Sequence, residues 1–210
     1  MSNKFPRFTT PAGVAVQWPK VTRPDTKFDA DGVYSLKLAF DPEDIEDLTQ
    51  ELVAVRDEFL STLPPAKARK VTIADVTDAE EDDDGEETGR AILKTKLKAK
   101  VTSKKTGESW DQRPRIFDAQ GRDITDTGDI RIGSGSVLKA NIEAVPYLME
   151  STRTVGVSLR LRAVQVIKLV EGGGAGASSY GFGSEDGYTA PATAAGFAAA
   201  DDTDEDDEDF

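Results

Sequence analysis

The 210-residue sequence contains no cysteine and no histidine, and these two absences remove several kinds of chemistry together. Without cysteine there are no disulfides and no thiolate nucleophiles, and without histidine no imidazole can act as a general base. Nearly every zinc site also needs one of these two residues. Carboxylates, lysine, serine and Mg²⁺ sites remain as catalytic options, but no constellation of them stands out. We therefore expect a protein that is not an enzyme and that holds no cofactor and no metal.

Long apolar runs are also missing from the sequence. The first ten residues, MSNKFPRFTT, lack the apolar segment of a signal peptide. No run approaches the roughly 20 apolar residues that a membrane-spanning helix needs. We expect a soluble intracellular protein without membrane contact, and its length suits one packed domain with appendages or two very small domains.

Basic residues are missing from two acidic segments, and this distribution matters more than the formal net charge of −13. Residues 75–87 hold nine acidic residues and residues 171–210 hold eleven, with no lysine or arginine in either segment. Taking these 20 from the 39 acidic residues leaves 19 against all 26 basic ones, a net charge of +7. The sequence therefore predicts a basic body that carries two acidic attachments.

The second acidic segment ends in the run DDTDEDDEDF at residues 201–210. Such a run cannot bury enough apolar surface to fold, so we expect it to be disordered. Its charges would attract a basic groove over a distance, and the final ring with the terminal carboxylate would be a specific anchor. A purely solvating tail is the alternative. The predicted partner-binding residues are Asp201, Asp202, Asp204, Glu205, Asp206, Asp207, Glu208, Asp209 and Phe210.

Composition also predicts the domain boundaries. Residues 172–200 are mostly Gly, Ala and Ser, which is typical of a flexible linker spanning on the order of 30 Å. We predict a folded domain at 1–170, a linker at 171–200 and the acidic tail at 201–210. Within the domain, residues 75–89 are expected to form an acidic, solvated loop. They do not fit a calcium-binding loop, because Ala91 stands where a bidentate Glu is required.

The folded domain is predicted to consist mainly of strands, at residues 13–18, 32–40, 92–101, 137–148 and 155–170. One amphipathic helix is expected to begin with Asp41 as N-cap and Pro42 at its first position, and to end before Pro64. A loop is expected around Pro19 and Pro24. Strands without βαβ alternation, together with one helix, favour an all-β fold with an OB-fold-like antiparallel barrel.

The segment 92–101, ILKTKLKAKV, is the most informative strand. Its odd-numbered residues share an apolar face, and the four lysines at 94, 96, 98 and 100 share the other face at a spacing of about 6.6–6.8 Å. Such a row could follow a phosphate backbone, or it could protect an edge strand against aggregation. The basic residues and Trp110 that follow in the sequence favour binding.

Single-strand-binding barrels combine a cationic groove with aromatic rings on which bases stack. Trp18, Tyr34, Trp110 and Tyr147 are the candidate rings, and each could instead belong to the core, although Tyr147 shares the polar face of its strand. The candidate phosphate-binding residues are Lys94, Lys96, Lys98, Lys100, Lys104, Lys105, Arg113, Arg115, Lys139, Arg160 and Arg162.

The order of several short motifs resembles the single-stranded DNA-binding proteins of short-tailed lytic bacteriophages nearly from end to end. The motifs are Arg23-Pro24-Asp25, Gly32-Val33-Tyr34, Lys104-Lys105-Thr106 with Glu108, Leu138-Lys139, Val145-Pro146-Tyr147, Val155-Gly156, Gly172-Gly173-Gly174 and the acidic end with Phe210. No single motif is decisive, but their order together with the tail is specific. The acidic segment 75–87 and the aromatic residues of the linker depart from the family pattern.

The resemblance implies an OB-fold homodimer that coats single-stranded DNA in phage DNA replication, recombination and repair, in the cytoplasm of the infected bacterial host. It implies that the tail occupies the DNA groove when DNA is absent and docks on the phage DNA polymerase and helicase-primase when DNA is present. It also implies DNA contacts by Tyr147 and by Lys4 and Arg7 of the basic N-terminal arm. The alternative is an acidic-tailed scaffold or chaperone-like interaction protein that does not bind DNA.

Overall fold

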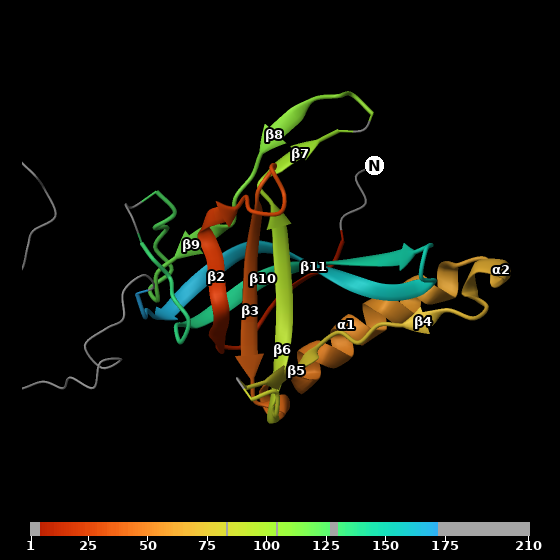
Figure 1. The fold of residues 1–210 in the computed structure, drawn as a ribbon, viewed down its shortest axis with the longest axis horizontal. Helices are drawn as coiled ribbons and strands as arrows, with labels where there is room; N and C mark the ends of the chain where they lie inside the picture. The colour runs from red at the N-terminus through yellow and green to blue at the C-terminus, as the bar shows by residue number, and fades with distance from the viewer. Residues whose placement is uncertain (1–4, 83, 104, 127–129, 172–210) are drawn as a thin grey trace, which may run out of the picture. The chain divides into compact units, whose positions relative to one another are not determined.

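The computed structural model describes residues 5–82, 84–103, 105–126 and 130–171 (Figure 1). The predicted linker and acidic tail therefore lie outside the described residues, apart from Glu171. The elements are β1 Arg7–Thr9, β2 Gly13–Asp25, β3 Val33–Phe40, α1 Pro42–Thr62, α2 Pro65–Ala68, β4 Thr72–Ile73, β5 Asp78–Glu81, β6 Glu87–Lys98, β7 Lys100–Thr102, β8 Ser109–Asp111, β9 Arg115–Phe117, β10 Val137–Met149 and β11 Thr154–Lys168.

Five of these strands close into a barrel. Strand β2 pairs antiparallel with β3, β3 pairs antiparallel with β6, and β11 pairs antiparallel with β10, which returns to β2. The ring closes between β6 and β11, whose short pairing is parallel. A closed barrel of five strands in this order confirms the predicted OB-fold. Four further strands attach to this ring: β1 to β10, β4 and β9 to β11, and β5 to β6. Strands β7 and β8 pair with each other in a separate two-stranded sheet.

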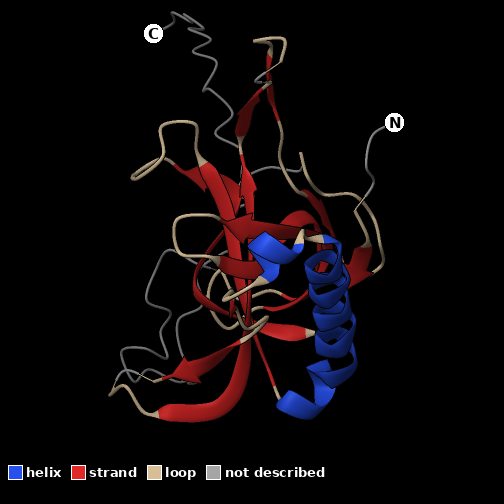
Figure 2. Cartoon of the chain, turned by 90° about the vertical axis from the view of Figure 1, so that its right-hand side faces the viewer, coloured by secondary structure: helices blue, strands red, loops and turns tan. Residues whose placement is uncertain are grey.

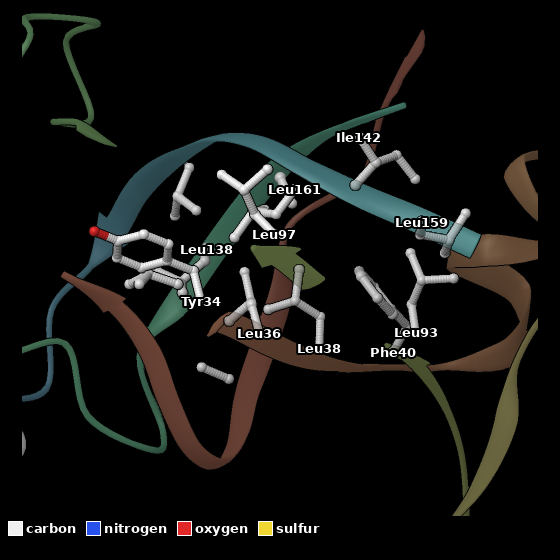
Figure 3. Close-up of a cluster of buried hydrophobic side chains, with 14 of the residues drawn as sticks. Tyr34, Leu36, Leu38, Phe40, Leu93, Leu97, Leu138, Ile142, Leu159 and Leu161 are labelled. Carbon is white, nitrogen blue, oxygen red and sulfur yellow. The ribbon is translucent and has the colours of Figure 1, made fainter. Parts of the chain in front are cut away.

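The interior of the barrel is filled by alternate residues of these strands (Figure 3). Strand β3 contributes Tyr34, Leu36, Leu38 and Phe40, all buried, as its alternating pattern predicts. They meet Leu93 and Leu97 of β6, Leu138 and Ile142 of β10, and Leu159 and Leu161 of β11. Burying one such side chain contributes about 1.5–3 kcal/mol, so this cluster is the main source of stability.

The predicted helix is confirmed as α1, with Pro42 in its first turn. Its residues Ile45, Leu48 and Leu52 are buried, and the helix contacts β6, β10 and β11. Figure 2 shows the long helix along one side of the strands. Asp41 is the N-cap residue, as predicted, although its side chain makes no capping hydrogen bond. A second helix, the short α2, follows directly because Pro65 begins a new turn.

The loop predicted around Pro19 and Pro24 is instead part of β2. The strand absorbs both prolines through irregularities: Gln17 and Trp18 adopt left-handed backbone angles, with φ of 52° and 57°, and the pairing with β3 shifts register on either side of Lys20. Proline removes a ladder hydrogen bond, and such irregular positions accommodate that loss.

The acidic loop predicted at 75–89 is also wrong in part, because residues 78–81 and the start of β6 form a β-hairpin. Glu80 is buried rather than solvated. Its carboxylate accepts hydrogen bonds from Thr88 Oγ1 at 2.6 Å and from Arg90 Nε and Nη2 at 2.6 and 2.7 Å. Burial disfavours the charge of Glu80, but these hydrogen bonds and the charge of Arg90 outweigh it and lower the pKa of the carboxyl group.

Replacing Glu80 by alanine is expected to cost about 2 kcal/mol of unfolding free energy, because two charge-assisted hydrogen bonds from Arg90 are lost. For a domain of this size the melting temperature would fall by about 4–8 °C. Because the folded-state pKa is lowered, the contribution is fully present above the ordinary glutamate pKa of about 4.3 and is lost as the pH falls through the folded value. Thermal melts of Glu80→Ala and Asp84→Ala at pH 7 and pH 3 measure this; equal effects of the two substitutions would contradict it.

Candidate nucleic-acid interface

The four predicted lysines of segment 92–101, which we call the lysine row, lie on the outer surface of the barrel. Lys94, Lys96 and Lys98 are exposed on β6, and Lys100 is exposed at the start of β7. Leu93, Thr95 and Leu97 between them are buried, so the alternation inferred from the sequence is confirmed. The strand breaks at Ala99, whose N–H donates to the Gly32 carbonyl at 2.8 Å.

Protection of an edge strand does not explain these lysines, because β6 is not an edge. Residues Ala91 to Lys98 pair with β3 on one side. On the other side β6 pairs with β5 near its start and with β11 at Thr95 and Lys96. Both rows of backbone groups are therefore engaged over much of the strand, and the lysines need another explanation.

Lys37 of β3 adds a further cation to this surface. It pairs in register with Lys94, and its ammonium donates a hydrogen bond to Gln17 Oε1. Burial, followed by the charges of Lys94 and Lys96, lowers the pKa of Lys37 from its ordinary value, which Asp78 partly offsets. Three ammonium groups that repel one another form a concentrated site for an anion. We call Lys37, Lys94 and Lys96 the lysine cluster.

Lys37 was not among the predicted binding residues, although the strand pattern indicates that it faces outward. Lys37 has the same parity in β3 as Val33 and Ser35, opposite the buried Leu36 and Leu38. It therefore had to face outward. What the sequence does not reveal is that β3 lies beside β6, so that Lys37 adjoins the lysine row.

Acidic side chains hold two members of the lysine row. Asp78 of β5 lies 3.1 Å from Lys94 Nζ, and Asp29 of the loop 26–32 lies 3.4 Å from Lys98 Nζ. Lys96 between them has no acidic partner among the residues that the structure describes. Lys94 and Lys98 are therefore partly neutralised, whereas the charge of Lys96 between them is available to an anion.

Arg7 and Arg160 lie on neighbouring strands in the same cross-strand register as Lys96. Lys96 pairs with Arg160 on β11, Arg160 with Glu143 on β10, and Glu143 with Arg7 on β1. The buried Glu143 carboxylate accepts hydrogen bonds from Arg160 Nη1 at 2.8 Å and from Arg7 Nε at 3.4 Å. Both arginines are therefore partly neutralised, and Arg7 also helps to hold β1 against β10.

Exposed aromatic rings accompany the cations. The Trp18 ring is 80 % exposed, and the backbone N–H of this residue donates to Ser134 Oγ at 3.1 Å. Trp110 is 49 % exposed on the β7–β8 hairpin, which projects beyond the end of β6 (Figure 1). Phe28, which was not among the predicted residues, is 89 % exposed in the loop 26–32. Tyr34 is 8 % exposed and belongs to the core, so its candidacy as a stacking ring was wrong.

Residues 12–169 match the model of the family described as "Single-stranded DNA-binding protein, Bacteriophage T7", which is most of the chain. The chain belongs to this family. No curated protein sequence matches it significantly.

Solved structures of phage proteins share the fold of this family member. One is the crystal structure of gp2.5, a single-stranded DNA-binding protein encoded by bacteriophage T7, at a TM-score of 0.64 and 24 % identity over 89 % of this chain and 100 % of that chain. Another is the single-stranded DNA-binding protein of bacteriophage Enc34 in complex with single-stranded DNA, at a TM-score of 0.52 and 12 % identity over 79 % of this chain and 88 % of that chain. These likenesses confirm the fold that the resemblance implied.

Several predicted residues of this family member lie away from the lysine cluster. Tyr147 is half-buried on β10 opposite Gly156, so close that a Cβ at Gly156 would lie 2.6 Å from the tyrosine hydroxyl. Arg115 pairs with Asp123 and lies over the Phe117 ring at 5.4 Å, and Lys139 lines a shallow hollow beside the same ring. Their contact with nucleic acid stays a prediction.

The other predicted cations are distributed as follows. Arg113 forms an ion pair with Asp126, and Lys105 is exposed in the turn of the β7–β8 hairpin. Arg162 is exposed on β11, where the pairing with β10 shifts register. Lys4, Lys104 and the tail residues Asp201 to Phe210 lie outside the described residues.

Two other expectations concern metals and membranes. Within the described ranges, no group of three or more metal-ligating side chains comes together. No helix in that part of the chain is long and apolar enough to cross a membrane.

Proposed function

We propose that this protein binds single-stranded DNA across the outer face of β2, β3 and β6. The observation that carries the proposal is an OB-fold barrel that presents both the lysine cluster and two exposed indole rings. Trp18 follows Gln17, which binds Lys37, and Trp110 lies on the hairpin beyond the end of β6. The ammonium groups would neutralise phosphates and release counterions, and the rings of Trp18 and Trp110 would stack on bases. Neither contact depends on base identity, so the protein would cover single strands of any sequence.

The position of this face supports the proposal. OB-folds bind oligonucleotides on the second and third barrel strands, flanked by the loops between strands one and two and between strands four and five. Here those strands are β3 and β6, and the loops are residues 26–32 and 150–153. Asp29 joins the first loop to Lys98, and Tyr147 stands on β10 shortly before the second loop. The DNA would cross the lysine row between them.

The cellular role that we propose follows from the resemblance and from the sequence of the tail. The protein would coat single-stranded DNA during phage DNA replication, recombination and repair, as a homodimer in the cytoplasm of the infected host. Its acidic tail would compete with DNA for the basic face and recruit the phage DNA polymerase and helicase-primase. No catalytic step belongs to this function.

Intrinsic tryptophan fluorescence tests the proposal, since Trp18 and Trp110 are the two tryptophans of the chain and both are exposed. Titration with oligo-dT at two salt concentrations should give salt-sensitive quenching, and the single-tryptophan variants Trp18→Phe and Trp110→Phe assign it to a ring. Duplex DNA of the same length is the control and should quench less. Absence of quenching and of binding by oligo-dT would contradict the proposal and leave the acidic-tailed scaffold.

Asp78→Asn is expected to tighten binding of oligo-dT about threefold to fivefold at 0.1 M salt. In the unbound protein Asp78 forms an ion pair with Lys94, and a phosphate must displace this carboxylate in order to bind. The substitution therefore frees Lys94 for about one additional phosphate contact. Asp84→Asn removes the same charge from the turn of the same hairpin and is the matched control. Equal changes in the two dissociation constants would show a general charge effect and contradict the role of the Asp78–Lys94 pair.

A further inference from the structure

The loop 26–32 holds one large apolar side chain out in solvent while its own backbone is well hydrogen-bonded. The Asp25 carboxylate accepts from the Lys27 N–H at 2.8 Å, and the Asp29 carboxylate accepts from the Asp31 N–H at 3.1 Å. The Asp29 carbonyl accepts from the Gly32 N–H at 2.8 Å. With φ of +75°, Gly32 adopts a left-handed conformation that suits glycine. These hydrogen bonds fix the backbone of the loop on either side of Phe28.

Two contacts join this loop to the lysine row. The Asp29 carboxylate lies 3.4 Å from Lys98 Nζ, and the Gly32 carbonyl accepts from the Ala99 N–H at 2.8 Å. Phe28 is therefore one residue from a group that touches the end of the row. Figure 1 shows the loop at the same end of β6 as the β7–β8 hairpin that carries Trp110.

The loop presents an exposed aromatic ring and a cation together. Phe28 is 89 % exposed, whereas Pro24, Ala99 and the Gly32 backbone pack together beneath the loop. Lys27 Nζ lies 5.2 Å from the centre of the Phe28 ring, so a cation and an aromatic face are presented together. A nucleotide offers a phosphate and a base at comparable separation, and each would meet its complement here.

We infer that Phe28 is a base-stacking residue and that Lys27 binds the adjacent phosphate, so that the loop 26–32 extends the DNA-binding surface beyond Lys98. This inference rests on the proposed function, because it assigns a further contact to the same single strand. The Asp29–Lys98 ion pair positions the loop. Because the Phe28 ring is exposed, its replacement should change the unfolding free energy of the protein little.

The test compares wild type, Phe28→Ala, Phe28→Leu and Phe28→Trp on oligo-dT and on an abasic oligonucleotide with the same number of phosphates. Phe28→Ala and Phe28→Leu should weaken binding of oligo-dT about fivefold to tenfold, at the lower end of the value of one base–aromatic stack. Phe28→Trp should restore it. Binding of the abasic strand and the salt slope should not change. Ile167→Ala, an exposed apolar truncation on β11, is the control and should bind as wild type does.

The outcomes separate this inference from the proposed function. Wild type that fails to bind oligo-dT would overturn both. Wild type that binds while Phe28→Ala binds equally well would overturn the inference alone. Equal weakening on the normal and abasic strands would also overturn it, since the ring would then act on the backbone rather than on a base. Thermal melts of each variant check that the fold is unchanged.

Discussion

Replacing Lys37 and Lys96 together by alanine is expected to weaken binding of single-stranded DNA about 25-fold at 0.1 M salt. Each lysine that neutralises a phosphate contributes about −0.7 to the slope of log K against log salt, which corresponds to about fivefold at this concentration. Neither residue is held by an acidic side chain among the described residues, so both charges are available to DNA. The slope should decrease in magnitude by about 1.4.

The matched control for this pair is Lys70→Ala with Lys168→Ala. Lys70 follows α2, and Lys168 is the last residue of β11. Their replacement changes the net charge by the same amount. Salt titrations of fluorescence quenching measure both constants. An equal loss in the control would mean that DNA responds to net charge alone, and an unchanged slope in the Lys37 and Lys96 variant would place the DNA elsewhere.

Deleting residues 201–210 is expected to tighten binding of single-stranded DNA about tenfold or more at low salt and to abolish recruitment of partner proteins. The segment carries eight acidic residues, which compete with phosphates for a body of net charge +7. The gain in affinity should shrink as salt rises, because the screening length falls from about 10 Å at 0.1 M to about 3 Å at 1 M.

Two partial variants separate the charge of the tail from its terminal ring. Changing the eight acids to Asn and Gln while keeping Phe210 should tighten DNA binding as the deletion does. Removing Phe210 alone should leave DNA affinity almost unchanged and weaken binding of the phage DNA polymerase, measured by pull-down or surface plasmon resonance. Weaker DNA binding by the deleted protein would refute competition between tail and DNA.

Local periodicity was enough to predict much of the candidate face. The side-chain period of a strand is two, so the parity of residues 92–101 placed the four lysines outside and Leu93 and Leu97 inside. The same reasoning placed Leu36 and Leu38 in the core. The missing residue types and the acidic runs indicated a binding protein with separate acidic attachments. This inference uses composition alone, so it does not depend on which segments lie side by side in the fold.

Tertiary structure decided everything that depends on neighbours distant in the sequence. Closure of the barrel put Lys37 beside Lys94, removed β6 from the edge, and set Asp29 and Asp78 against the lysine row. It also buried Glu80 against Arg90 in a segment whose composition predicted a loop. It left Phe28 exposed, one residue from the Asp29 carboxylate that contacts Lys98. The physical reason is that strand order and register arise from long-range pairing and packing, whereas the sequence pattern reports only which face of a segment is apolar.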